Sequence, residues 1–131
     1  MSFIKEFQRV QKQTHKINES KGFNDIDVQI NSLSKLYDVP LDLVENIKAA
    51  RMAQKLLLAV GEISETLESL RHGDPPDSHI PKFRGSEAEI ADAIIRLMNL
   101  AEDGNLRLAE AIIAKSSYNS RRPKFHGGKK F

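Results

Sequence analysis

Apolar side chains recur at helical spacing along most of this chain, and no segment alternates with the two-residue period typical of a half-buried strand. The strongest stripe lies late in the segment 41–70, where aliphatic residues follow one another at intervals of three and four: Leu56, Val60, Ile63, Leu67 and Leu70. A helix patterned in this way has one apolar face that must pack against another element. The sequence therefore predicts an all-α fold, organised as a helical bundle.

Glycine and proline mark the expected ends of the helices. Helices are expected from Phe3 to a stop at Gly22, within 28–37, and over 41–70, 86–104 and 106–118. The segment 72–85 is rich in glycine and proline and is expected to be a loop. Ser86 and Glu89 have the spacing of a capping box. Gly61 interrupts the long helix at a cost of about 1 kcal/mol relative to alanine, so a neighbouring backbone or ligand is expected close beside it.

The composition limits the chemistry that the chain can carry out. Its 131 residues suffice for one small domain, expected to span 1–131 with a basic carboxy-terminal tail at 120–131. The absence of cysteine excludes a disulfide scaffold, a thiolate zinc site and a cysteine nucleophile. Charges near the amino terminus argue against a secretory signal, and the longest aliphatic run, 56–60, is too short to span a membrane. We therefore expect a cytoplasmic protein with no membrane association.

Two acidic pairs are the candidate chemistry. Glu62 and Glu65 project from one face of the long helix, and Glu89 and Asp92 project from one face of the next. Each pair lies at the edge of its helix's apolar stripe, and folding the helices antiparallel across the 72–85 loop brings all four carboxylates to nearly one level. Clustered carboxylates repel one another unless a cation lies among them, and hard oxygen ligands suit Mg²⁺ or Mn²⁺, which in turn bind phosphate oxygens.

A simpler interpretation of the same spacing stays open at this point. Glu89 could be the capping-box partner of Ser86, and Asp92 could pair with Arg96 one helical turn later. Acidic pairs of this kind are common on solvated helices, so spacing alone does not separate the two interpretations.

Charge is distributed unevenly along the chain. Residues 62–103 carry ten acidic and four basic side chains, whereas 115–131 carry six basic and no acidic ones. An acidic face and a cationic arm fit two sides of one anionic ligand. Taken alone, the tail fits the simpler interpretation of a solubilising terminus or a weak nucleic-acid-binding arm. A net charge of only +2 gives no reason to expect a nucleic-acid partner for the chain as a whole.

The acidic pairs and two motifs that flank them along the chain resemble those of the MazG-like all-α nucleoside triphosphate pyrophosphohydrolases, a family related to dimeric dUTPases and phosphoribosyl-ATP pyrophosphohydrolase. The central motif is Glu62-x-x-Glu65, a 23-residue spacer and Glu89-x-x-Asp92. The motifs that flank it are His15-x-x-Asn18-x-x-Lys21-Gly22-Phe23 and Lys115-x-x-Tyr118-Asn119-x-x-Arg122-Pro123 with His126-Gly127. Residues 27–54 form a longer connection than in compact relatives, and the chain has no tryptophan near the base, so base selectivity does not follow from the resemblance.

The resemblance implies a reaction and a role for each residue of the motifs. A (deoxy)nucleoside triphosphate would be hydrolysed between its α and β phosphates to the monophosphate and pyrophosphate, with Mg²⁺, or Mn²⁺ in its place, as the cofactor. Glu62 or Glu65 would act on the attacking water. The implied metal ligands are Glu62, Glu65, Glu89 and Asp92, the implied phosphate-binding residues are Lys115, Tyr118, Asn119 and Arg122, and the implied nucleoside-binding residues are His15, Asn18 and Phe23.

Assembly is expected to complete the site. Two helices with acids at the edge of their stripes cannot enclose a nucleotide alone, so a homodimer or homotetramer is expected, as the resemblance also implies. Two other functions remain open: a nucleotide-binding regulator without turnover, and a helical interaction protein whose basic tail contacts nucleic acid.

Overall fold

The computed structural model describes residues 2–123 and is all-helical over that range, with no strand. The five helices are α1 (Phe3–Ser20), α2 (Asp25–Leu36), α3 (Leu41–Arg71), α4 (Gly85–Asp103) and α5 (Leu108–Ser120). The fold class predicted from the sequence is confirmed. Part of the expected basic tail, 124–131, and the His126-Gly127 portion of the carboxy-terminal motif lie outside the described residues.

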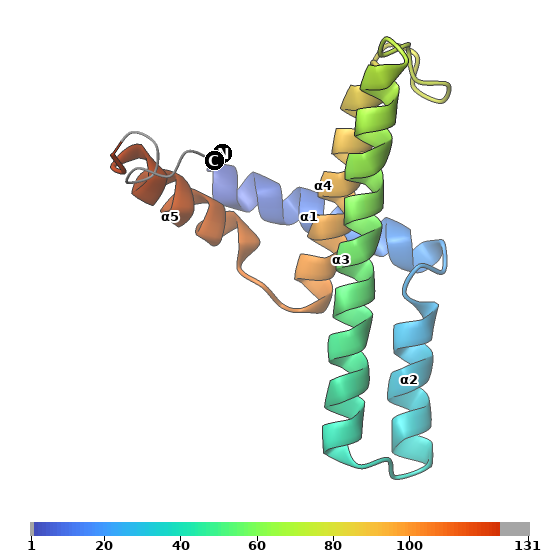
Figure 1. Ribbon diagram of the computed structural model, residues 1–131. Helices are drawn as coiled ribbons and strands as arrows, with labels where there is room; N and C mark the ends of the chain where they lie inside the picture. The colour runs from blue at the N-terminus through green and yellow to red at the C-terminus, as the bar shows by residue number, and fades with distance from the viewer. Residues whose placement is uncertain (1, 124–131) are drawn as a thin grey trace.

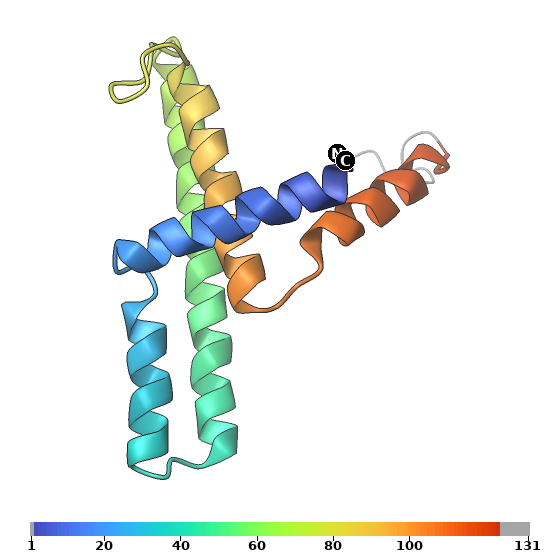
Figure 2. The same cartoon turned by 180° about the vertical axis from the view of Figure 1, so that it is seen from behind.

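The long helix α3 is the axis of the fold (Figure 1). α4 runs antiparallel beside its carboxy-terminal half, and α2 lies beside its amino-terminal half. Seen from behind, α1 crosses the α3–α4 pair near its middle, and α5 packs along the amino-terminal part of α1 (Figure 2). The arrangement therefore places α5 to one side, away from the end of the hairpin where α3 turns into α4.

Two local expectations about helix structure are wrong. The helix after the loop begins at Gly85, and the carboxylate of Glu87 accepts from the backbone N–H of Arg84, so Ser86 and Glu89 do not form the capping box. Ser86 instead donates from its backbone and its hydroxyl to Asp74, which ties the loop to the helix. Gly61 has no close neighbour either, because a Cβ built there would meet nothing within 4 Å among the described residues.

Small residues make up most of the core. The buried apolar residues are Val44, Ala59, Ala88, Ala93, Met98, Leu100, Ala101 and Ala109. By contrast, the stripe of α3 that the sequence marks as its core face remains about half exposed: Leu67 is 49% and Ile63 57% accessible. The stripe has the predicted spacing, but the single chain leaves its residues about half exposed.

The accessible surface agrees with this description. The chain exposes 10172 Å², whereas a folded monomer of 14.8 kDa is expected to expose about 7,000 Å². The chain therefore exposes about 3,200 Å² more than a compact monomer of its mass. Among residues 2–123, no helix combines the length and the apolar character needed to cross a membrane.

Candidate active site

Three of the four candidate carboxylates come together between α3 and α4. One oxygen each from Glu62, Glu89 and Asp92 lies within 4.8 Å of the other two. The antiparallel hairpin produces this meeting: Glu62 lies nine residues before the end of α3, and Glu89 and Asp92 lie four and seven residues after the start of α4. We call these three residues the acid group. Glu65 is exposed and does not belong to it, although its charge acts on Glu89.

Glu62 is the buried member of the acid group. The residue is 7% accessible, and its Oε1 accepts a hydrogen bond from Nε of Arg96 at 2.5 Å. An ionised carboxylate at such a position needs a partner, and the guanidinium supplies it. Arg96 thus makes its ion pair across the hairpin with Glu62, and not with Asp92 on its own helix as the simpler interpretation of the spacing suggested.

Burial and neighbouring negative charge raise the pKa values of two members of the acid group. Burial, the charge of Glu65 and a hydrogen bond with Glu62 raise the pKa of Glu89 above its ordinary value. Burial and the charge of Glu62 raise the pKa of Asp92, although Arg96 acts in the opposite direction. One guanidinium therefore does not balance the three carboxylates, and a further positive charge would be stabilised among them.

The donor set of the acid group fits a hard divalent cation. Mg²⁺ prefers carboxylate and water oxygens at 2.0–2.1 Å in octahedral geometry, so ligands on opposite sides of the ion are about 4.2 Å apart. The three oxygens lie within 4.8 Å of one another, so small side-chain rotations suffice to bring them into range. No nitrogen or sulfur ligand is present in the group, which favours Mg²⁺ or Mn²⁺ over softer metals.

A pocket of about 290 Å³ opens beside the acid group. Two residues from the amino-terminal motif, Asn18 and Phe23, contribute to its wall, and Phe23 is 60% accessible. Asp92 belongs to both the acid group and the pocket. The remaining lining residues, which the motifs do not include, are Arg51, Lys55, Leu58, Ile95, Arg96 and Asn99.

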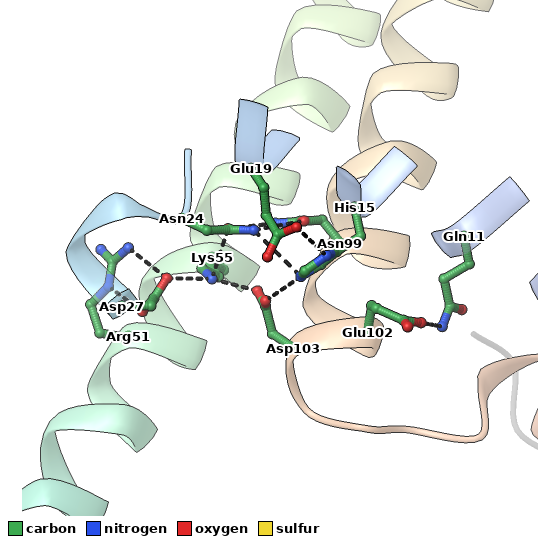
Figure 3. Close-up of polar contacts among 10 residues, drawn as sticks. All are labelled: Gln11, His15, Glu19, Asn24, Asp27, Arg51, Lys55, Asn99, Glu102 and Asp103. Atoms are coloured by element: carbon green, nitrogen blue, oxygen red, sulfur yellow. Dashed lines mark hydrogen bonds and ion pairs between the residues drawn. The ribbon is translucent and has the colours of Figure 1, made fainter. Parts of the chain in front are cut away.

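A polar network forms one side of this pocket (Figure 3). Nζ of Lys55 lies 2.7 Å from Asp27 and 2.5 Å from Asp103, and it donates to Oδ1 of Asn24 at 3.3 Å. The amides of Asn24 and Asn99 are both buried, and each donates to the other. Four elements of the fold therefore meet here: the α1–α2 connection, α2, α3 and α4. The network fixes the connection that carries Phe23.

His15 lies in this network and does not line the pocket. Its Nε2 is 2.7 Å from an oxygen of Asp103 and 3.4 Å from the amide nitrogen of Asn24. Its other ring nitrogen lies 3.7 Å from Glu19. A nucleoside contact by His15 stays a prediction, while the contacts that the structure gives it hold α1 against the end of α4.

The predicted phosphate-binding residues lie apart from the acid group within one chain. Lys115, Tyr118 and Asn119 are on α5, which packs mainly against α1. Nζ of Lys115 lies 5.2 Å and the guanidinium carbon of Arg122 5.7 Å from the centre of the Tyr118 ring. Both cations therefore lie against the same aromatic ring. The structure brings these residues together with one another, but not with the carboxylates (Figure 1).

Sequence comparison adds no relative to this description. No family model matches the chain, and neither a curated protein nor a solved structure matches it.

Proposed function

We propose that this protein is a Mg²⁺-dependent nucleoside triphosphate pyrophosphohydrolase that hydrolyses a (deoxy)nucleoside triphosphate to the monophosphate and pyrophosphate. The observation that carries the proposal is the acid group. Two antiparallel helices form it from residues of the central motif, and a pocket of about 290 Å³ opens beside it. A carboxylate cluster next to a pocket wide enough for a nucleoside suits a ligand that combines phosphates with an organic group.

Glu62, Glu89 and Asp92 are the residues that would hold the metal. When bound, Mg²⁺ would neutralise phosphate oxygens and orient the triphosphate for attack. Mn²⁺ satisfies the same ligand set and is expected to substitute. Glu65 lies outside the acid group, so its carboxylate oxygens are available to orient the attacking water and to accept its proton.

The pocket would take the nucleoside part of the substrate. The exposed ring of Phe23 offers a surface for a base to stack on, and the side-chain amide of Asn18 offers both a donor and an acceptor. Leu58 and Ile95 give the pocket an apolar wall. The proposal names neither a base nor a sugar and covers ribo- and deoxyribonucleoside triphosphates alike.

A second copy of the chain would supply the cationic half of the site. Lys115, Tyr118, Asn119 and Arg122 contribute phosphate contacts in this proposal, but α5 holds them away from the acid group of their own chain. The excess of about 3,200 Å² per chain is well above the roughly 800 Å² that one partner contributes to a standard interface. We therefore include a homodimer or homotetramer in the proposal.

A pyrophosphate-release screen tests the proposal. Purified protein is incubated with canonical and modified nucleoside triphosphates in Mg²⁺ and in Mn²⁺. At least one substrate is expected to yield pyrophosphate and monophosphate, and Glu62→Gln and Asp92→Asn are expected to abolish the release. Glu68→Gln is the matched control, since Glu68 lies on the same helix but pairs with Arg71 outside the acid group.

Negative results in this screen would favour one of the two other functions. If no triphosphate yields pyrophosphate with either metal, the enzyme proposal is wrong. Calorimetric binding of a triphosphate without turnover would then indicate a nucleotide-binding regulator. Strongly salt-dependent binding to nucleic acid, lost on truncation after Asn119, would indicate the interaction protein instead.

A further inference from the structure

One arginine lies between the acid group and the pocket. Arg96 is on α4, one turn after Asp92, and its Nε donates to the buried Glu62 across the hairpin. The same side chain lines the pocket, and it is 35% accessible. Arg96 is therefore in contact with the carboxylates on one side and with the space for a ligand on the other.

The position of Arg96 has opposite consequences for two kinds of ligand. An arginine guanidinium carries a positive charge. On Glu62 this charge stabilises the metal-free protein, because Glu62 would otherwise be a buried carboxylate without a partner. A divalent cation on the same carboxylate would compete for its oxygen and would be repelled by the guanidinium. An anion in the pocket would be attracted by the same group.

We infer that Arg96 is an exchangeable counter-ion of the acid group, which pairs with Glu62 in the absence of a divalent cation and turns into the adjacent pocket to bind a phosphate oxygen when the cation is present. The inference rests on the proposed function in taking Glu62 as a metal ligand. Arg96 is then a phosphate-binding residue contributed by the same chain, on a helix that already carries Glu89 and Asp92.

This exchange couples the binding of metal and of polyphosphate. Arg96 opposes binding of the metal alone, and it favours the state in which both metal and anion are bound. Each ligand therefore raises the affinity for the other by the same factor. The protein would take up the metal together with the triphosphate, and the free protein would keep its acid group partly neutralised.

The test compares Arg96→Gln with the unchanged protein in two separate titrations. The first measures binding of Mn²⁺ alone from the electron paramagnetic resonance signal of the free ion. The second measures calorimetric binding of inorganic tripolyphosphate in excess Mg²⁺. We expect Arg96→Gln to bind Mn²⁺ about tenfold more tightly and tripolyphosphate about tenfold more weakly, within the usual range of coupling between sites. A change of opposite sign for the two ligands is not expected from a general loss of structure.

Two controls accompany these titrations. Arg71→Gln removes an arginine that also pairs with a glutamate, but on the exposed face of α3, and it should change neither affinity. Arg96→Lys keeps the charge and loses the fixed N–H fork, so its Mn²⁺ affinity should stay close to that of the unchanged protein. If Arg96→Gln fails to fold, the Nε–H signal of Arg96 can be followed by NMR in the unchanged protein. It should shift on addition of Mg²⁺ alone and again on addition of tripolyphosphate.

The possible failures can be told apart. If Arg96→Gln leaves both affinities unchanged, or weakens both, the role of Arg96 is wrong, whatever the outcome of the pyrophosphate screen. An Nε–H signal that stays unmoved by saturating Mg²⁺ would overturn it as well. Opposite shifts in a protein that releases no pyrophosphate would support the role of Arg96 and reject only the enzymatic function. Absence of any Mn²⁺ binding would reject both.

Discussion

Replacement of Asp92 by asparagine should make the metal-free protein more stable while it abolishes the proposed activity. The carboxylate oxygens lie within 4.8 Å of one another. Two unit charges at that separation repel each other by about 3.5 kcal/mol at an effective dielectric constant of 20 and by about 0.9 kcal/mol in water. Asp92 is exposed, so the lower value is the better guide, and the attraction of Arg96 offsets part of it. We expect Asp92→Asn to raise the free energy of unfolding by about 0.5 kcal/mol, which corresponds to a melting temperature about 2 °C higher.

The assay is thermal unfolding in EDTA and in Mg²⁺, at one fixed protein concentration because assembly also affects the midpoint. In EDTA the variant should melt above the unchanged protein. In Mg²⁺ the order should reverse, since only the unchanged protein gains stability by binding the ion. Pyrophosphate release by the Asp92→Asn variant should fall at least about 100-fold. A variant that is less stable than the unchanged protein in EDTA, or that gains as much from Mg²⁺, would refute the reasoning.

Three further outcomes follow from the same geometry. The pKa values of Glu89 and Asp92 are raised above their ordinary values of 4.5 and 3.8, so the folded metal-free protein holds these protons more tightly than the unfolded chain does. This contribution to stability is lost as the pH rises through the raised pKa values, and over the same rise the stabilisation by Mg²⁺ in thermal melts should grow. Gly61→Ala should stabilise the long helix by about 1 kcal/mol in denaturant unfolding, because the added Cβ would meet no atom within 4 Å among the described residues. Gly85→Ala should instead destabilise the protein, because its Cβ would lie 2.2 Å from the hydroxyl oxygen of a serine on α3. Ile63→Glu places a charge on the exposed apolar stripe and should convert the proposed oligomer to a smaller species in light scattering. If the unchanged protein is itself a monomer in this measurement, the proposed assembly is wrong.

Periodicity predicted the helices better than it predicted what they bury. The long helix was expected over 41–70 and is found at Leu41–Arg71, because a regular apolar stripe and a proline at its start are local signals. Burial depends on what lies opposite the stripe, and residues such as Ile63 remain exposed because one chain supplies no partner for them. The prediction for Gly61 also concerned what lies opposite the helix, and the close neighbour expected there is absent from the described residues.

The candidate site was predictable only in part. The spacing of Glu62, Glu89 and Asp92 on antiparallel helices was enough to bring them together. The partner of Arg96 was not predictable, because residues 34 positions apart in the sequence form that pair and helical spacing favours the nearer Asp92. The network around Lys55 was missed for the same reason, since all its partners come from other elements. No local pattern carries such pairings.

The alanines of the hairpin have a consequence for the reach of its ligands. Ala88 and Ala93 each adjoin an acidic residue of α4, and both are buried, as is Ala59 on α3. Helix axes pack closer together when the side chains at the contact are small. Close axes bring the short side chain of Asp92 within reach of the longer Glu62 on the facing helix. Side-chain volume at these alanines therefore sets the width of the gap across which the carboxylates must meet.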